Sequence, residues 1–121
     1  MNENDFWSYL NAESAKGMAQ CIVGCMDPEA MDELPELKYL AGHSLLPANY
    51  ENVPQDKIIG MGKLLFDKNI KIKTKESILI LLAHQTTKDA LFFLQEYNKC
   101  PDSKLRIFAE LALDECLMWN S

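Results

Sequence analysis

The sequence has few of the patterns that mark β-strands, membrane spans or secreted proteins. The only alternation of apolar and polar residues is Ile-Lys-Ile-Lys at 70–73, which lies between two helical patterns and is expected to be a connection. The longest apolar run, 78–83, is far shorter than the roughly 20 residues that a membrane-spanning helix needs. The first residues are acidic and aromatic, which argues against a cleaved signal peptide. We therefore expect a cytoplasmic protein that is not associated with a membrane.

Recognised catalytic and metal-binding motifs are also missing. Cys21 and Cys25 would share one face of a helix, which supplies half of a zinc site. No second closely spaced ligand pair follows, so reduced, buried thiols are the first interpretation and a metal- or thiol-dependent protein is an alternative. His84 ends an apolar run, where a protonated imidazole near a helix C-terminus is favourable, and no recognised spacing links it or His43 to a nucleophile. We expect no enzymatic activity, cofactor or metal.

Charge divides the sequence into two parts. Residues 1–56 hold ten acidic residues and two lysines, a net charge of −8, whereas residues 57–121 hold eight acidic and ten basic residues, a net charge of +2. The total of −6 argues against general nucleic-acid binding. It is more typical of a protein whose partner has a basic face.

The acidic part contains a cluster of carboxylates at Asp27, Glu29, Asp32, Glu33 and Glu36. A calcium-binding EF-hand loop would need regularly spaced ligands, a central glycine and a terminal glutamate, and this pattern is missing. A solvated helix face is the simplest interpretation. The alternative is a partner-binding patch formed by Asp32, Glu33 and Glu36.

Short helices are expected before residue 54. Asp5 is a candidate cap for a first turn, and apolar residues recur at helical spacing from Ala15, as two short pieces or one long helix. Asp27-Pro28 and Leu34-Pro35 each resemble the start of a further helix. Residues 43–54 are expected to form a loop.

Four regular helices are predicted from Pro54 onward. The first begins at Pro54 and closes at 68–69, and Thr74 is the expected cap of the second, which is apolar on most sides and therefore buried. A threonine at 86 or 87 caps the third, and residues 101–103 open the fourth. The expected buried face of the fourth helix consists of Leu105, Phe108, Ala109, Ala112, Leu113, Cys116 and Leu117.

The predicted helices contain an internal repeat. A shift of 29 residues places Thr74 on Ser103 and Lys75 on Lys104. The same shift aligns four apolar positions, Ile78 with Ile107, Leu79 with Phe108, Leu82 with Leu111 and Ala83 with Ala112. Repeated units of this kind stack on one another because one unit cannot bury its apolar face alone.

The two aligned tracts resemble the HEAT-like family of helical repeats. They read Thr-Lys-Glu-Ser-Ile-Leu-Ile-Leu-Leu-Ala from Thr74 and Asp-Ser-Lys-Leu-Arg-Ile-Phe-Ala-Glu-Leu-Ala from Asp102. In that family an acidic or hydroxyl residue opens the second helix of each pair, a basic residue follows, and an Ile/Ala-rich buried face comes next. Asp102 with Arg106 approximates this pattern, and Thr74 with Lys75 matches it less well.

The resemblance covers residues 54–121 and implies an all-α fold. The implied architecture is a short right-handed helical-repeat array of antiparallel helix pairs, with residues 1–53 as acidic N-terminal capping helices. The whole of 1–121 would form a single domain. Two repeats make a short array, so the capping helices are expected to complete its core.

Lysines gather in the basic part, at Lys63, Lys68, Lys71, Lys73 and Lys75. Only Phe66 interleaves with them, which is fewer aromatic residues than a nucleic-acid stacking surface needs. Self-association is an equal rival, because the acidic part of one copy would complement this run in another. Lys71 and Lys73 are therefore candidate interaction residues.

Two adjacent aromatic residues, Phe92 and Phe93, cannot both point to the same side of a helix. An exposed Phe92 would indicate a contact surface. The alternative is ordinary packing of these rings against Tyr97 or Trp119.

Taken together, these patterns predict a non-enzymatic protein–protein interaction or scaffold module, with a homodimer as one form. An acidic inhibitor or immunity-type protein that masks a basic partner surface is the second hypothesis. A small metal- or thiol-dependent protein using Cys21 and Cys25 is the third. The candidate surface residues are Asp32, Glu33, Glu36, Lys71, Lys73 and Phe92.

Overall fold

The structure is a computed structural model that describes residues 1–17, 39 and 46–120. Its helices are α1 (Glu3–Ala15), α4 (Gln55–Leu64), α5 (Ile72–Ala83), α6 (Lys88–Lys99) and α7 (Arg106–Trp119), with a short 3-10 helix, η2 (Ser103–Leu105), before α7. No β-strand occurs among the described residues, and the all-α prediction is confirmed for them. The helix starts expected at Asp27-Pro28 and Leu34-Pro35 lie outside this part of the chain.

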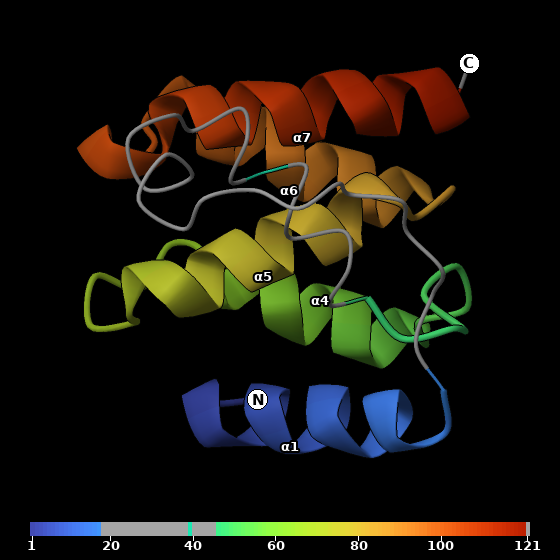
Figure 1. Ribbon diagram of the computed structural model, residues 1–121. Coiled ribbons are helices and arrows are strands. Elements are labelled where there is room, and N and C mark those ends of the chain that lie inside the picture. The colour runs from blue at the N-terminus through green and yellow to red at the C-terminus, as the bar shows by residue number, and fades with distance from the viewer. Residues whose placement is uncertain (18–38, 40–45, 121) are drawn as a thin grey trace, which may run out of the picture.

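The helices are stacked, with α1 at one end, α4 and α5 in the middle, and α6 and α7 at the other end (Figure 1). Within the stack, α4 packs against α5 and α6, and α7 packs against α5 and α6. A single cluster of buried apolar side chains runs from Phe6 of α1 to Cys116 of α7. None of the helices in the described ranges is long and apolar enough to cross a membrane.

The first helix begins earlier than expected, because Asn2 and not Asp5 is its N-cap. The Asn2 side chain accepts a hydrogen bond from the Asp5 backbone N–H (2.8 Å), and the Asp5 carboxylate accepts one from the Asn2 N–H (3.0 Å). This reciprocal capping box satisfies two helix-end donors at once. The helix ends at Ala15, and Gly17 has a φ of 147°, which favours glycine. The alternative of one long N-terminal helix is therefore wrong.

The second predicted boundary that fails is the end of α4. The helix starts after Pro54 as expected but ends at Leu64, not at 68–69. The chain tightens there, because Phe66 and Asp67 donate their N–H groups to carbonyls three residues back. The Asp67 carboxylate then accepts the Asn69 N–H (2.9 Å), which closes a turn that competes with the helix.

The start of α5 is two residues before the predicted cap, so Ile72 and Lys73 are helical and not part of a connection. Thr74 lies inside the first turn, and Lys71 is the N-cap residue without a side-chain cap. A carboxylate from α1 replaces the missing cap: Glu3 accepts a hydrogen bond from the Lys71 N–H (3.2 Å) and one from the Thr74 hydroxyl. A local pattern could not predict a cap supplied from 68 residues away.

The last two helices agree better with their sequence signals. Thr87 caps α6, its hydroxyl accepting the Ala90 N–H at 3.3 Å. On the predicted inner face of the last helix, the buried residues are Leu105 of η2 and Phe108, Ala109, Ala112 and Cys116 of α7, and Leu113 is partly buried. Leu117 was expected on this face, but it is 42% exposed because the helix turns it away from α5 and α6.

Candidate interaction surface

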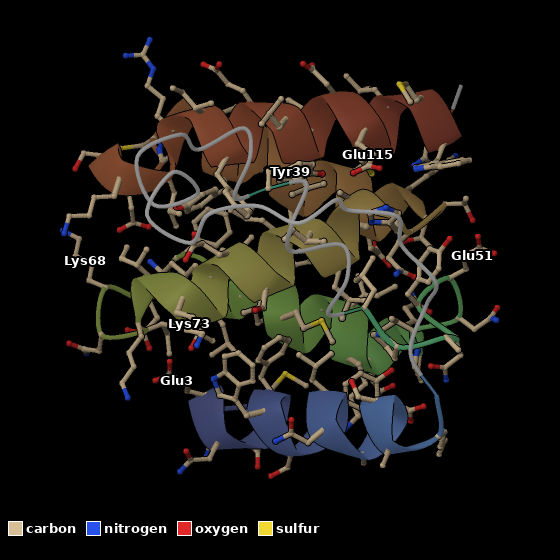
Figure 2. All side chains as sticks on the ribbon, in the orientation of Figure 1. Glu3, Tyr39, Glu51, Lys68, Lys73 and Glu115 are labelled. Carbon is tan, nitrogen blue, oxygen red and sulfur yellow. The ribbon has the colours of Figure 1, made fainter. Side chains whose placement is uncertain are left out.

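A buried polar cluster joins the end of α5 to α7. His84, the C-cap residue of α5, has its Nδ1 2.8 Å from the Ile80 carbonyl oxygen and its Nε2 3.0 Å from the Glu115 carboxylate. The Tyr39 hydroxyl donates to the other Glu115 oxygen at 2.5 Å, and Figure 2 labels both residues. Burial first, and then this hydrogen bond, raises the pKa of Tyr39. The cluster joins Tyr39 to α5 and α7.

Cys116 lies beside this cluster, where its environment suppresses nucleophilic character. The thiol lies 3.6 Å from the Gln85 carbonyl oxygen and 3.4 Å from the Asn120 side-chain amide. Burial raises its pKa to about 11. Because the thiolate is the reactive form, Cys116 is a packing residue at neutral pH.

The metal hypothesis rests on cysteines of which only two lie among the described residues. Within the described ranges, no group of three or more His, Cys, Asp or Glu residues is placed to hold a metal ion. Cys21, Cys25 and His43 lie outside those ranges. Cys100 is exposed, and Cys116 is buried on α7.

Lys75, which the sequence places in the basic run, is buried in a second polar cluster and is not a surface residue. Lys75 is 2% exposed, and its Nζ lies 2.8 Å from an Asp102 carboxylate oxygen. The Tyr97 hydroxyl also donates to that carboxylate. Lys75 is therefore an internal tie between α5 and the segment before η2 and does not belong to the surface. Arg106, the basic residue that follows Asp102 in the HEAT-like pattern, points outward, with its Nε 3.8 Å from Glu110.

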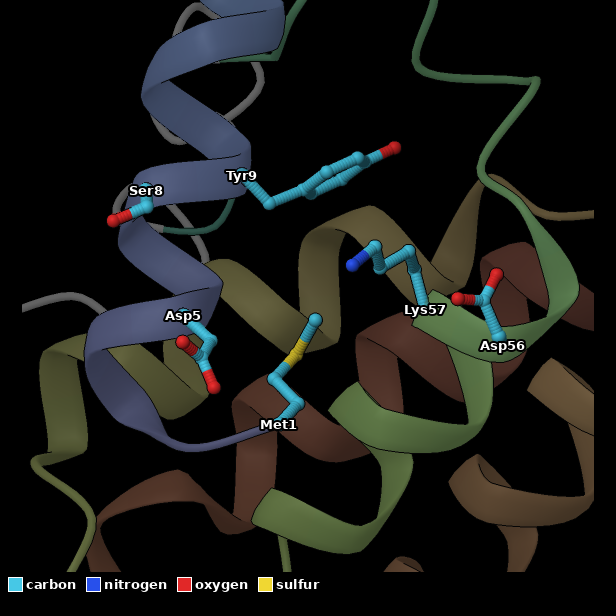
Figure 3. A pocket seen from close by; sticks show the side chains of 6 residues that line it. All are labelled: Met1, Asp5, Ser8, Tyr9, Asp56 and Lys57. Carbon is cyan, nitrogen blue, oxygen red and sulfur yellow. The ribbon is translucent and has the colours of Figure 1, made fainter.

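A hollow of about 460 Å³ opens between α1 and α4, and no sequence pattern predicted it (Figure 3). The Lys57 ammonium group lies 5.8 Å from the centroid of the Tyr9 ring. Burial, followed by the nearby carboxylates of Glu13 and Asp56, raises the pKa of Tyr9. Asp5 also lines the hollow, but its carboxylate already serves the capping box. The hollow is open to solvent and is lined by charges of both signs, so it lacks the features of a specific binding site.

The connection between α4 and α5 carries the clearest surface feature. Phe66 is 51% exposed and contacts the edge of Tyr97, with 6.0 Å between ring centroids. Lys68, Lys71 and Lys73 are exposed beside it in the chain. Figure 2 places Lys68 and Lys73 at the same end of the molecule, near Glu3. We refer to Phe66, Lys68, Lys71 and Lys73 as the basic corner.

Phe92 is exposed on α6, which is what the contact-surface alternative requires. It is 55% exposed, and its ring packs edge-on against Phe93 with centroids 5.6 Å apart, not against Tyr97 or Trp119. It lies on a different helix from the basic corner. Asp32, Glu33 and Glu36, the remaining predicted interaction residues, lie outside the described part of the chain.

Comparison with protein-family models, curated proteins and solved structures finds no match to this chain. The resemblance to HEAT-like repeats therefore stays a prediction from the two aligned tracts.

Proposed function

We propose that this chain is a non-enzymatic protein-interaction module built from two HEAT-like helix pairs. The order of contacts supports the repeat: α4 and α6 pack against each other, as do α5 and α7, and the helices of each pair are also in contact. Such neighbour-to-neighbour stacking is typical of helical repeats, whose outer helices offer binding surfaces. In this arrangement α1 covers the first pair.

The basic corner is the proposed binding surface. It combines a half-exposed aromatic ring with three exposed lysines, and interfaces are enriched in aromatic residues that act as anchors. The first turn of α5 contains no acidic residue of its own, and the Glu3 carboxylate of α1 already caps it. A partner carboxylate would pair with the exposed ammonium groups of Lys71 and Lys73. The proposed partner is therefore an acidic protein surface with an apolar contact for Phe66.

The same surface fits nucleic acid less well. The basic corner has one aromatic residue, and the chain as a whole carries a net charge of −6. Nucleic-acid binding depends on many basic contacts and on stacking platforms. The second hypothesis, an acidic inhibitor, depends on Asp32, Glu33 and Glu36, and the same experiment can test it.

The experiment compares quantitative affinity capture by the wild type and by charge-reversed variants from an extract of the source cells. We expect Lys71→Glu/Lys73→Glu and Phe66→Ser to lose a defined set of co-purifying proteins, at least tenfold for the double variant. Lys88→Glu/Lys99→Glu is the matched control, since it changes net charge equally on another helix and should retain that set. Raising the salt concentration should weaken capture, because the contacts are exposed ion pairs.

Equal capture by the wild type and the corner variants would contradict the proposal. If capture is instead lost with Asp32→Lys/Glu33→Lys, the acidic-inhibitor hypothesis replaces it. Binding of a labelled oligonucleotide at physiological salt that Lys71→Glu/Lys73→Glu abolishes would favour nucleic acid as the ligand.

A further inference from the structure

The two ends of the helix stack differ in how they are covered. At one end, α1 lies over α4 and α5 and buries Phe6 and Leu10 (Figure 1). The α6–α7 pair forms the opposite end. Several large apolar side chains of these last two helices remain exposed, namely Phe92, Ile107, Leu117, Met118 and Trp119.

The exposed side of α6 is basic with an aromatic centre. Lys88, Phe92, Gln95 and Lys99 are all exposed, and their spacing of four, three and four residues places them on one face of the helix. Lys99 has an i,i+3 contact with Glu96 at 2.8 Å. Exposed pairs of this kind contribute little and rearrange readily.

The exposed side of α7 has the opposite charge. Ile107, Glu110, Asp114 and Leu117 are all exposed and are spaced three, four and three residues apart, again on one face. Two carboxylates therefore lie between two apolar side chains. Arg106 approaches Glu110 only at 3.8 Å, with both side chains more than half exposed.

The two stripes lie on neighbouring helices and are of similar length. The Asn98 side chain on α6 donates to the Ala109 carbonyl of α7 at 3.0 Å, which fixes the helices side by side. Lys88 and Lys99 are about 16 Å apart along α6, and Ile107 and Leu117 about 15 Å apart along α7, at 1.5 Å per residue. Leu91 and Leu113, both partly buried, share a face with these stripes.

We propose that the α6–α7 face binds a second copy of this chain about a two-fold axis. A face that is basic on one helix and acidic on its neighbour is complementary to itself, because the rotation places α6 of each copy opposite α7 of the other. The basic stripe of each copy then faces the acidic stripe of the other, while Phe92 and Leu117 become covered. The proposal does not depend on the basic corner, which belongs to a different part of the surface.

The size of the face sets the expected affinity. Two helices of this length packed side by side present a patch of roughly 20 by 20 Å. Stable complexes usually bury about 800 Å² per partner. We therefore expect a concentration-dependent dimer that high salt weakens, because exposed charges contribute much of the complementarity.

The test is sedimentation of the whole chain and of two charge-reversed variants, alone and mixed. Glu110→Lys/Asp114→Lys makes both stripes basic, and Lys88→Glu/Lys99→Glu makes both acidic. Each variant alone should dimerise at least tenfold more weakly than the wild type. An equimolar mixture should recover the dimer, because the acidic face of one variant then meets the basic face of the other. Circular dichroism should show that both variants keep their helix content.

Three results would overturn the proposal. The first is a wild type that sediments as a monomer at every concentration tested. The second is dimerisation of both variants as strong as that of the wild type, which would place the interface elsewhere. The third is a mixture that fails to associate although the wild type dimerises. Lys71→Glu/Lys73→Glu is the control from the basic corner and should leave the dimer unchanged.

Discussion

Lys75 is predicted by its sequence neighbours to be exposed, but the structure buries it. In the sequence it belongs to a run of lysines, and in the structure it is 2% exposed and paired with Asp102. Its spacing was a signal, because it precedes Ile78 and Leu79 by three and four residues and so shares their buried face. The run of positive charge concealed that helical register.

The Lys75–Asp102 pair should respond unequally to removal of its two members. Asp102→Ala leaves a buried ammonium group without its carboxylate, and we expect a loss of roughly 2–3 kcal/mol, below the full range for buried pairs because Asp102 is 31% exposed. Lys75→Met keeps the volume and removes the charge, and should cost about 1 kcal/mol or less. Urea unfolding measures both. A larger loss for Lys75→Met would contradict this assignment.

The same pair gives a pH dependence. Burial favours a higher pKa for Asp102, but the hydrogen bonds from Lys75 and Tyr97 outweigh it and hold the pKa below its ordinary value. The unfolded carboxyl therefore binds its proton at higher pH than the folded one. The stabilisation is fully present above the unfolded pKa of about 3.9 and is lost as pH falls through the folded value. The stability difference between wild type and Asp102→Asn should shrink below about pH 4.

At the level of elements, the approach of α4 to α6 depends on one glycine. The ring of Phe93 lies directly against Gly62, where an added Cβ would come within 2.3 Å of ring carbons. Gly62 is buried on α4, whereas a glycine inside a helix ordinarily weakens it by about 1 kcal/mol relative to alanine. The absence of a side chain therefore serves packing between the two helices.

Gly62→Ala should destabilise the protein by roughly 1–3 kcal/mol, because the clash with Phe93 exceeds the gain in helix propensity. Gly60→Ala is the matched control on the same helix. An added Cβ there would come 2.9 Å from the Cβ of Met1. Because Met1 precedes α1 and can move aside, we expect the free energy of unfolding to change by no more than about 0.5 kcal/mol. Thermal unfolding of both variants, and of Gly62→Ala/Phe93→Leu as the relieved form, decides the matter. Equal stability of Gly62→Ala and wild type would show that α6 does not pack this closely.

At the level of the whole molecule, three segments distant in sequence meet at Glu115. Its carboxylate accepts the Tyr39 hydroxyl and lies 3.0 Å from the His84 ring, and the Tyr39 ring packs edge-on against Phe108 at 5.0 Å. These contacts join α5, α7 and Tyr39. Sequence patterns could assign His84 to a helix end but could not identify its partner.

Glu115→Ala should cost about 2–3 kcal/mol, because it leaves buried polar groups without this acceptor. Asp114→Ala, which removes the adjacent exposed carboxylate, is the control and should change stability by less than about 0.5 kcal/mol. Tyr39→Phe keeps the ring contact with Phe108 and should lose only about 1 kcal/mol. The unfolding should be measured in dilute solution, where self-association does not contribute. Similar losses of unfolding free energy for Glu115→Ala and Asp114→Ala would contradict a specific stabilising role of Glu115.

The sequence alone determined the helical class, the approximate course of the helices after Pro54, a threonine cap at 86 or 87 and most of the inner face of α7. These features depend on local hydrogen bonds and on a period of apolar residues, which a linear chain displays directly. Tertiary structure alone decided that Glu3 caps α5, that Lys75 pairs with Asp102, and that α6 and α7 place stripes of opposite charge side by side. Each of these depends on residues brought together by packing, because a side chain can satisfy a charge or a donor from any distance along the sequence.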